Sequence, residues 1–230
     1  MSEKKYAVKE VFRTLQGEGA NAGRLSVFVR LSGCNVWSGL EEHRVRDSAK
    51  GACARFCDTD FVGTDGENGG SYTAKELAQV ALDQLRETPD EEFDHWDSRR
   101  GHRPLLVLTG GEPSLQITNA LISTFIKLSF DVAVETNGSV FLPGRLDTWV
   151  TLSPKPPLAI QDQHYDEVKV LYPLFDPLPH AERARFRYVQ PVDSGDEALN
   201  RANLEACLEF IRKNPSWRLS LQTHKLIGLP

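Results

Sequence analysis

Three of the four cysteines in this chain lie close together in the sequence. Cys34, Cys53 and Cys57 are separated by 18 and then by three residues, whereas Cys207 lies 150 positions further along. A disulfide would use two of the three thiols, and a closed tetrahedral zinc site needs a fourth ligand, for which His43 is a candidate. A [4Fe–4S] cluster held by three thiolates leaves one iron open to a small molecule. The cysteines by themselves therefore leave structural zinc and a catalytic cluster open.

The composition favours a soluble enzyme that does not bind nucleic acid or membranes. The 230 residues are 40% hydrophobic and 26% charged, and 32 acidic against 27 basic side chains give a net charge of −5. Such a chain has no general attraction for nucleic acid or anionic lipid. No secretory signal opens the chain and no apolar run reaches transmembrane length, so we predict a cytoplasmic protein. In that reducing compartment, clustered thiols favour a metal over a disulfide.

Polar motifs come directly after several predicted strands. The carboxyl ends of parallel strands open on one face of a sheet, where such folds build their sites. The cysteines follow a predicted strand over 25–31, so we expect them on the same face. The other motifs are Thr109-Gly110-Gly111-Glu112-Pro113, Glu135-Thr136-Asn137-Gly138, Ser153-Pro154-Lys155 and Gln190-Pro191.

The alternation of apolar strands with helical patterns predicts an α/β fold with mostly parallel strands and right-handed crossovers. Some later connections are too short for full helices, so an open or partial barrel fits better than eight complete units. Residues 1–230 read as a single domain, with a charged, exposed loop over 87–103. The predicted strands are 25–31, 104–109, 131–135, 148–152, 167–171, 186–190 and 217–222, and the predicted helices are 73–88, with a capping box at its start, 114–127 and 196–213.

These motifs resemble the radical S-adenosylmethionine (SAM) superfamily and, within it, the 7-carboxy-7-deazaguanine synthase family. The Gly-Gly-Glu-Pro turn at 110–113 marks the superfamily. The segments Gln16-Gly17-Glu18-Gly19 and Gln222-Thr223-His224-Lys225 are more specific to the synthases, and the resemblance runs nearly end to end. It implies a partial (β/α) barrel of the radical SAM type. It also implies conversion of 6-carboxy-5,6,7,8-tetrahydropterin to 7-carboxy-7-deazaguanine with loss of ammonia, in the queuosine and 7-deazapurine pathway.

Two alternatives to this activity stay open at this point. One is another radical SAM activity, such as an activase that places a glycyl radical on a partner protein. The other is a zinc-binding module without catalysis. A small pterin pocket would favour the synthase, whereas an exposed face for docking a protein would favour the activase.

The resemblance also implies the cofactors and the residues that hold them. Cys34, Cys53 and Cys57 would hold a [4Fe–4S] cluster on a loop over about 33–60, and SAM would bind its open iron. Reductive cleavage of SAM would give a 5′-deoxyadenosyl radical, so no side chain need act as the main base. Mg²⁺, which prefers oxygen ligands, would lie near Thr59. The residues expected around SAM are Phe56, Asp58, Gly110, Gly111, Glu112, Asn137, Ser153, Lys155 and Gln190.

A second implied group of residues would bind the pterin. Arg30 suits a carboxylate, and the amide and carboxylate of Gln16 and Glu18 suit the donor–acceptor edge of the ring. A tail over about 222–230 would cover the pocket and place the terminal carboxylate of Pro230 against that edge. A homodimer and an electron donor such as flavodoxin are the expected partners. The predicted substrate residues are Leu15, Gln16, Glu18, Arg30, Thr109, His224 and Pro230.

One departure from the family pattern concerns the cysteine spacing. The usual triad ends in two cysteines separated by two residues, but here Ala54 stands where the middle cysteine belongs and Cys53 lies one position earlier. One extra residue moves a thiol by up to about 3.5 Å along an extended chain. We still expect Cys53 to be the second ligand, because no other cysteine is near. Cys207 shares the apolar face of its helix and is expected in the core.

Overall fold

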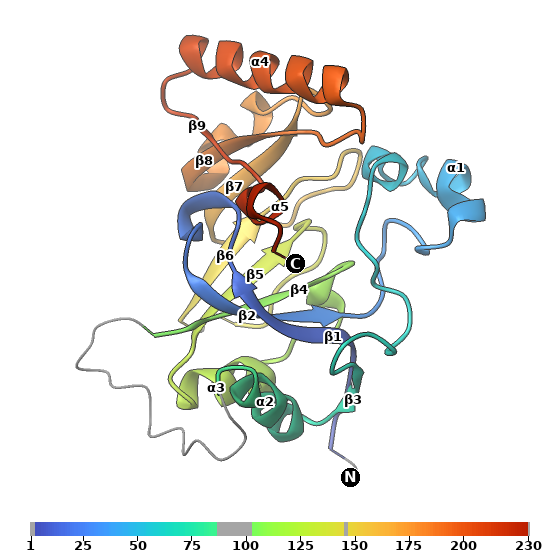
Figure 1. The fold of residues 1–230 in the computed structure, drawn as a ribbon, viewed down its shortest axis with the longest axis vertical. Helices are drawn as coiled ribbons and strands as arrows, with labels where there is room; N and C mark the ends of the chain where they lie inside the picture. The colour runs from blue at the N-terminus through green and yellow to red at the C-terminus, as the bar shows by residue number, and fades with distance from the viewer. Residues whose placement is uncertain (1–2, 87–102, 145–146, 230) are drawn as a thin grey trace.

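The computed structural model describes residues 3–86, 103–144 and 147–229, which form an open α/β barrel (Figure 1). Nine strands make one sheet in the order β3-β1-β2-β4-β5-β6-β7-β8-β9. They are β1 Tyr6–Leu15, β2 Leu25–Leu31, β3 Gly70–Tyr72, β4 Leu105–Gly110, β5 Asp131–Thr136, β6 Thr148–Leu152, β7 Tyr165–Tyr172, β8 Ala184–Pro191 and β9 Arg218–Leu219. The α-helices are α1 Arg44–Asp47, α2 Ala74–Asp83, α3 Asn119–Lys127, α4 Glu197–Lys213 and α5 Thr223–Ile227.

The topology is that of a partial barrel. Each neighbouring pair of strands from β2 across the sheet to β9 is parallel, whereas β1 joins antiparallel to both β2 and β3. Apart from β3, the strand order follows the chain order. A doubly wound sheet would reverse its strand order at a switch point, which does not happen here. β3 and β9 are the two edges, so the described sheet is not closed. The predicted α/β fold with mostly parallel strands is confirmed.

The helices cover the outer face of the sheet at two ends. α2 and α3 lie side by side over β1 to β5, and α4 covers β7 to β9 (Figure 1). The predicted capping box begins α2, because the Glu76 amide donates to Thr73 Oγ1 over 3.3 Å and the Thr73 amide donates to Glu76 Oε2 over 2.7 Å. Cys207 on α4 is fully buried beside Phe210 and Trp217, as expected of a core thiol. None of the described helices is long and apolar enough to span a membrane.

Several element boundaries differ from the prediction. α2 ends at Asp83 instead of continuing to Thr88, and the predicted loop over 87–103 lies outside the described residues except for Arg103. The second helix begins only at Asn119, because Pro113–Leu115 forms a 3₁₀ turn and the Thr118 side chain caps the helix that follows. The connections from β5 to β6 and from β6 to β7 contain no α-helix among their described residues, as the short-connection argument predicts.

The two ends of the chain differ most from the prediction. The sequence did not indicate β1, because Lys9, Glu10 and Arg13 interrupt its apolar alternation. Lys9 is nonetheless buried, with its ammonium 2.8 Å from Asp60 and 2.9 Å from Asp65. At the other end, the predicted strand over 217–222 reduces to the two residues of β9. The tail then forms the short helix α5, which the sequence did not predict.

Candidate active site

Two adjoining cavities open at the carboxyl ends of the parallel strands. The first, which we call the cysteine cavity, has a volume of about 230 Å³ and is lined by the three clustered cysteines. The second, which we call the arginine cavity, has a volume of about 520 Å³ and is lined by Arg30 and His224. Both cavities are lined by the same six residues at their boundary, which are Glu18, Asp58, Thr59, Thr109, Glu135 and Gln222.

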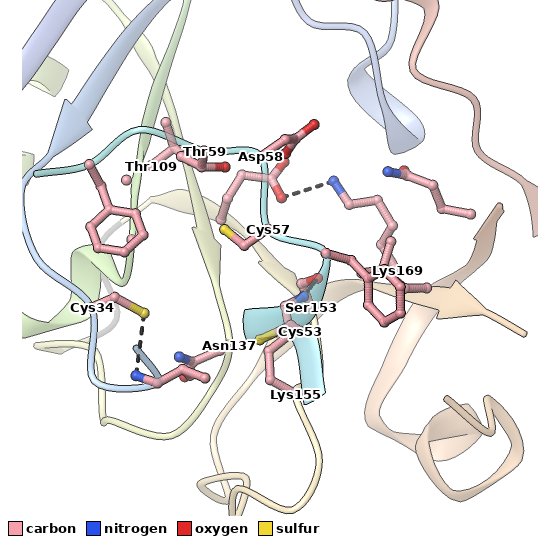
Figure 2. A pocket seen from close by; sticks show the side chains of 18 of the residues that line it. Cys34, Cys53, Cys57, Asp58, Thr59, Thr109, Asn137, Ser153, Lys155 and Lys169 are labelled. Carbon is pink, nitrogen blue, oxygen red and sulfur yellow. Dashed lines mark hydrogen bonds and ion pairs between the residues drawn. The ribbon is translucent and has the colours of Figure 1, made fainter. Parts of the chain in front are cut away.

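The three clustered thiols face one space. Figure 2 shows the sulfur atoms of Cys34, Cys53 and Cys57 turned toward the same hollow, and all three thiols are free. The irregular spacing is absorbed by a helical turn: Ala52–Arg55 forms a 3₁₀ helix and the Cys57 amide donates to the Cys53 carbonyl over 2.9 Å. Each residue of a helix advances the chain by only about 1.5–2.0 Å along the helix axis, compared with ~3.5 Å in an extended chain. The extra residue therefore does not carry Cys53 away from the site.

A single zinc ion would need a fourth ligand beside the three clustered thiols. Within the described residues, no group of three or more His, Cys, Asp or Glu side chains surrounds one metal position. Zinc needs all of its ligands at about 2.0–2.3 Å from one ion, whereas each thiolate of a [4Fe–4S] cluster binds its own iron. His43, the candidate fourth zinc ligand, does not line the cavity, and its Nδ1 lies 3.0 Å from Ser38 Oγ.

Charged side chains brace the loop that carries the cysteines. Arg44 donates to the carbonyls of Ala54 and Cys57, over 2.5 and 3.3 Å, and its guanidinium stacks 4.4 Å from the Trp37 ring centroid. Asp47 is fully buried and accepts from the Ser38 amide over 2.9 Å. This loop is therefore held by contacts that do not use the thiols.

The Gly-Gly-Glu turn after β4 packs against Gly33 and Cys34, and the Glu112 amide donates to the Gly33 carbonyl over 2.9 Å. A Cβ on Gly111 would lie 2.6 Å from the Cys34 Cβ, and a Cβ on Gly110 would lie 2.1 Å from the Leu31 carbonyl oxygen. Glycine is required there because no side chain fits between the two loops. Glu112 does not line the cavity: it is 1% exposed and accepts from the Asn137 amide and from Thr136 Oγ1, both over 2.7 Å. Its carboxylate ties the turn after β4 to the turn after β5.

The other residues predicted around SAM all line the cysteine cavity. Lys155 lies beside Cys53 (Figure 2), and burial lowers the pKa of its ammonium while the nearby Cys53 raises it. Burial also raises the pKa of the Cys53 thiol to about 11. A bound anion would offset the cost of burying this lysine. The lining residues predicted for SAM are Phe56, Asp58, Gly110, Gly111, Asn137, Ser153, Lys155 and Gln190.

A buried ion cluster that the sequence did not reveal lies at the boundary of the two cavities. Lys169 on β7 donates to Glu135 over 3.0 Å and to Glu18. Burial lowers the pKa of Lys169, but the charges of Glu135 and Glu18 outweigh this and raise it. Burial likewise raises the pKa of Glu18, yet Lys169 and hydrogen bonds from Gln222 and Gln190 lower it to about 2. The only sequence signal for this cluster was a lysine within an apolar strand.

The arginine cavity places a guanidinium against an aromatic wall. Arg30 Nε donates to Glu10 over 2.7 Å, and its guanidinium lies 5.9 Å from the Phe12 ring centroid. Phe12 stacks on Phe28 at 5.5 Å, and both rings line the cavity. Of the residues predicted to bind the pterin, Leu15, Gln16, Glu18, Arg30, Thr109 and His224 line this cavity, while Pro230 lies outside the described residues.

The tail helix α5 forms one wall of the arginine cavity. His224 and Leu229 line it, and burial lowers the pKa of the His224 imidazole. The tail is held to the segment 16–19, since the Thr223 amide and hydroxyl donate to the Gly17 carbonyl over 3.1 and 2.9 Å. A Cβ on Gly17 would lie 2.0 Å from His224 Nδ1. Two motifs more than 200 residues apart thus pack directly together.

Comparison with known proteins identifies the family. No protein-family model matches the chain. The 7-carboxy-7-deazaguanine synthase of Caulobacter vibrioides is 44% identical over 230 residues, covering 98% of this chain and 99% of that protein. The synthase of Burkholderia multivorans is 42% identical over 228 residues, covering 98% and 99%. The chain belongs to the 7-carboxy-7-deazaguanine synthase family.

A solved structure supports the fold independently of these relatives. The crystal structure of QueE from Escherichia coli superposes with a TM-score of 0.61, covering 94% of this chain and 93% of that one, at 24% sequence identity. At this identity the likeness concerns the fold alone. The synthase family and the radical SAM type of partial barrel, both expected from the motifs, are therefore confirmed.

Proposed function

We propose that this chain is a radical SAM enzyme that converts 6-carboxy-5,6,7,8-tetrahydropterin to 7-carboxy-7-deazaguanine with loss of ammonia. The observation that carries the proposal is the junction of the two cavities. A cavity lined by three free thiols adjoins a cavity lined by a guanidinium and aromatic rings, and the two share a wall. A cofactor in the first would therefore lie directly beside a carboxylated ring in the second. An activase would instead need an exposed docking face.

The cysteine cavity has the donor set that a cluster and SAM require. Cys34, Cys53 and Cys57 would hold the [4Fe–4S] cluster, and metal binding would remove the protons that burial retains on the Cys34 and Cys53 thiols. When bound and reduced, the cluster supplies the electron that cleaves SAM to a 5′-deoxyadenosyl radical. Lys155 is a half-buried cation in this cavity that is available to the SAM carboxylate, and Gly110 and Gly111 line the same cavity without side chains.

The arginine cavity would orient the pterin. The two terminal nitrogens of Arg30 form a fork suited to a carboxylate, while its Nε is held by Glu10. Glu18 and Glu135 present carboxylate oxygens at the shared wall, where they would accept from the amino edge of the ring. The walls Phe12 and Phe28 supply apolar surface for the ring faces. Holding the substrate in one orientation beside the cofactor is the protein's main contribution to the rate.

Thr59 is our proposed protein ligand for Mg²⁺. It lines both cavities, which supports a role at the boundary between cofactor and substrate. Mg²⁺ keeps several waters and needs few protein ligands. One hydroxyl and the substrate would therefore suffice to hold it.

The proposal keeps the remaining sequence-based predictions. The chain would act as one domain over 1–230 and as a homodimer, and it would take its electrons from a small donor protein such as flavodoxin. The tail over 222–230 would cover the pterin, since His224 and Leu229 already line its cavity. Sedimentation of the loaded protein tests the dimer.

The deciding experiment is turnover of the carboxypterin. Protein reconstituted anaerobically with iron and sulfide is incubated with reductant, SAM, Mg²⁺ and the carboxypterin. We expect 7-carboxy-7-deazaguanine and ammonia in equal amounts. Protein that carries a full cluster and cleaves SAM but leaves the pterin unchanged would contradict the proposal and favour another radical SAM activity.

A further inference from the structure

A buried carboxylate beneath the two cavities belongs to neither of them. Glu167 on β7 is 2% exposed and does not line the cysteine or the arginine cavity. It lies two residues before Lys169, so both side chains point to the interior face of the barrel. The mechanism outlined above gives Glu167 no role. A buried charged group without a partner would be costly, so its contacts indicate what it does.

The Glu167 carboxylate contacts the turn between β1 and β2. The Ala20 amide donates to Glu167 Oε2 over 2.7 Å. Gly19 has a φ of +65°, and a Cβ there would lie 2.0 Å from Glu167 Oε1. Gly19 is thus required both by its backbone conformation and by the closeness of the carboxylate.

The same turn carries the acidic residue that lines both cavities. Glu18 directly precedes Gly19, and its carboxylate accepts from Gln190 and from Gln222, each over 3.0 Å. The Gly19 amide donates to Ser220 Oγ over 3.0 Å, and Ser220 Oγ in turn donates to Gln190 over 2.9 Å. The turn is therefore fixed at its own backbone by Glu167 and Ser220, and a shift of that backbone would move Glu18.

We propose that Glu167 is a positioning residue, which holds the Gly19–Ala20 backbone so that the Glu18 carboxylate faces the substrate. It acts through the turn and touches neither cofactor nor substrate. The inference rests on the proposed function for its kinetic readout only. The claim that Glu167 holds the Gly19–Ala20 backbone depends only on contacts within this chain and not on the identity of the substrate.

The test compares Glu167→Ala and Glu167→Gln with Glu182→Ala, which removes a carboxylate whose side chain is 95% exposed. Glu167→Ala should raise KM for the carboxypterin at least tenfold and leave SAM affinity within twofold. Glu167→Gln keeps an oxygen acceptor for the Ala20 amide and should stay within threefold of the unaltered protein. Glu182→Ala should change neither value. A folded Glu167→Ala protein with unaltered KM would overturn the inference.

A double-mutant cycle with Gly19→Ala removes the dependence on any single variant. The added methyl group collides with the Glu167 carboxylate in the natural background but not in the Glu167→Ala background, while the strain from positive φ is common to both. We therefore expect Gly19→Ala to raise KM less in the Glu167→Ala background, and equal effects in the two backgrounds would contradict direct contact.

Hydrogen exchange of the amides at 17–20 should be faster in Glu167→Ala than in the unaltered protein, whatever the substrate. If the natural protein does not convert the carboxypterin, the proposed function fails and exchange alone decides the positioning role.

Discussion

The backbone amide of Cys57 donates a hydrogen bond to the carbonyl of Cys53 over 2.9 Å. This bond closes a helical turn, so the two thiols that the sequence separates by three residues face the same cavity. The unusual spacing is therefore compatible with a cluster held by Cys34, Cys53 and Cys57.

We predict that alanine at any one of these three positions abolishes iron loading and turnover, because the open-iron cluster needs all three thiolates. Cys207→Ala is the control: its thiol is buried in the core and should cost only about 1 kcal/mol of stability. Iron and sulfide content, visible absorbance and product formation are the measurements. Full iron content in Cys53→Ala would disprove the ligand assignment.

Removing the buried ammonium at the shared wall should destabilise the fold. Lys169→Met leaves Glu18 and Glu135 without their counter-ion, and an uncompensated buried charge costs about 3–5 kcal/mol. Lys213→Met, which breaks an exposed pair with Glu209, should cost less than about 1 kcal/mol. Denaturant unfolding at neutral pH measures both. Equal stabilities for the two variants would show that the buried ion cluster does not hold the barrel together.

Titration of the buried Glu167 carboxyl should make the free energy of unfolding depend on pH. Burial raises its pKa from 4.5 to about 7, although the charge of Lys169 opposes this and those of Glu135 and Glu18 add to it. A raised acid pKa means that the native state binds the proton more tightly than the unfolded state does. Its stabilising contribution is thus fully present below pH 4.5 and is lost as the pH rises to about 7.

Glu167→Gln cannot titrate, so it isolates this effect from the other ionisable groups. Relative to this variant, the natural protein should lose roughly 2.5 kcal/mol of unfolding free energy between about pH 5 and pH 8. Denaturant unfolding of both proteins at the two pH values measures the difference. A constant difference would mean that Glu167 titrates normally in the folded protein.

Thr59→Ala should raise the Mg²⁺ concentration needed for half-maximal rate and leave SAM affinity nearly unchanged, because Thr59 lines both cavities and is our proposed Mg²⁺ ligand. Thr64→Ala is the matched control, since Thr64 is exposed and lines neither cavity. The measurement is the initial rate over a Mg²⁺ titration. Identical titrations for the two variants would place the metal elsewhere.

Extending the chain beyond Pro230 should weaken pterin binding. Leu229 lines the arginine cavity, and the family resemblance predicts that the terminal carboxylate of Pro230 accepts from the amino edge of the pterin. A charge-assisted hydrogen bond contributes roughly 1.5–3 kcal/mol, so KM should rise about 10- to 150-fold. Uncoupled SAM cleavage should persist, and an N-terminal extension of equal length should have no effect. An unaltered KM in the C-terminally extended protein would rule out this contact.

The fold class, the family and many of the residues that line the two cavities could be predicted from the amino-acid sequence. The strands follow from their local apolar pattern, and the family and the pterin residues follow from the resemblance of the motifs. Motifs at the carboxyl ends of parallel strands must, in addition, converge on one face. The thiols after β2, the Gly-Gly turn after β4 and Ser153 after β6 were all placed by that argument alone.

The charged side chains in the interior could not be predicted from the sequence. In the sequence, Glu167 and Lys169 have the alternating pattern of solvent-facing residues in a strand. Their burial depends on the Glu18 carboxylate and on the Gly19–Ala20 turn, about 150 residues away. The strand β1 was not predicted for the same reason. Lys9 interrupts its apolar pattern, and this lysine can be buried because Asp60 and Asp65, more than 50 residues away, pair with its ammonium. Conversely, Glu112 looks like a ligand in its motif, but its carboxylate joins two turns behind the cavity wall. Partners distant in sequence determine whether a charge can be buried, and local pattern carries no information about them.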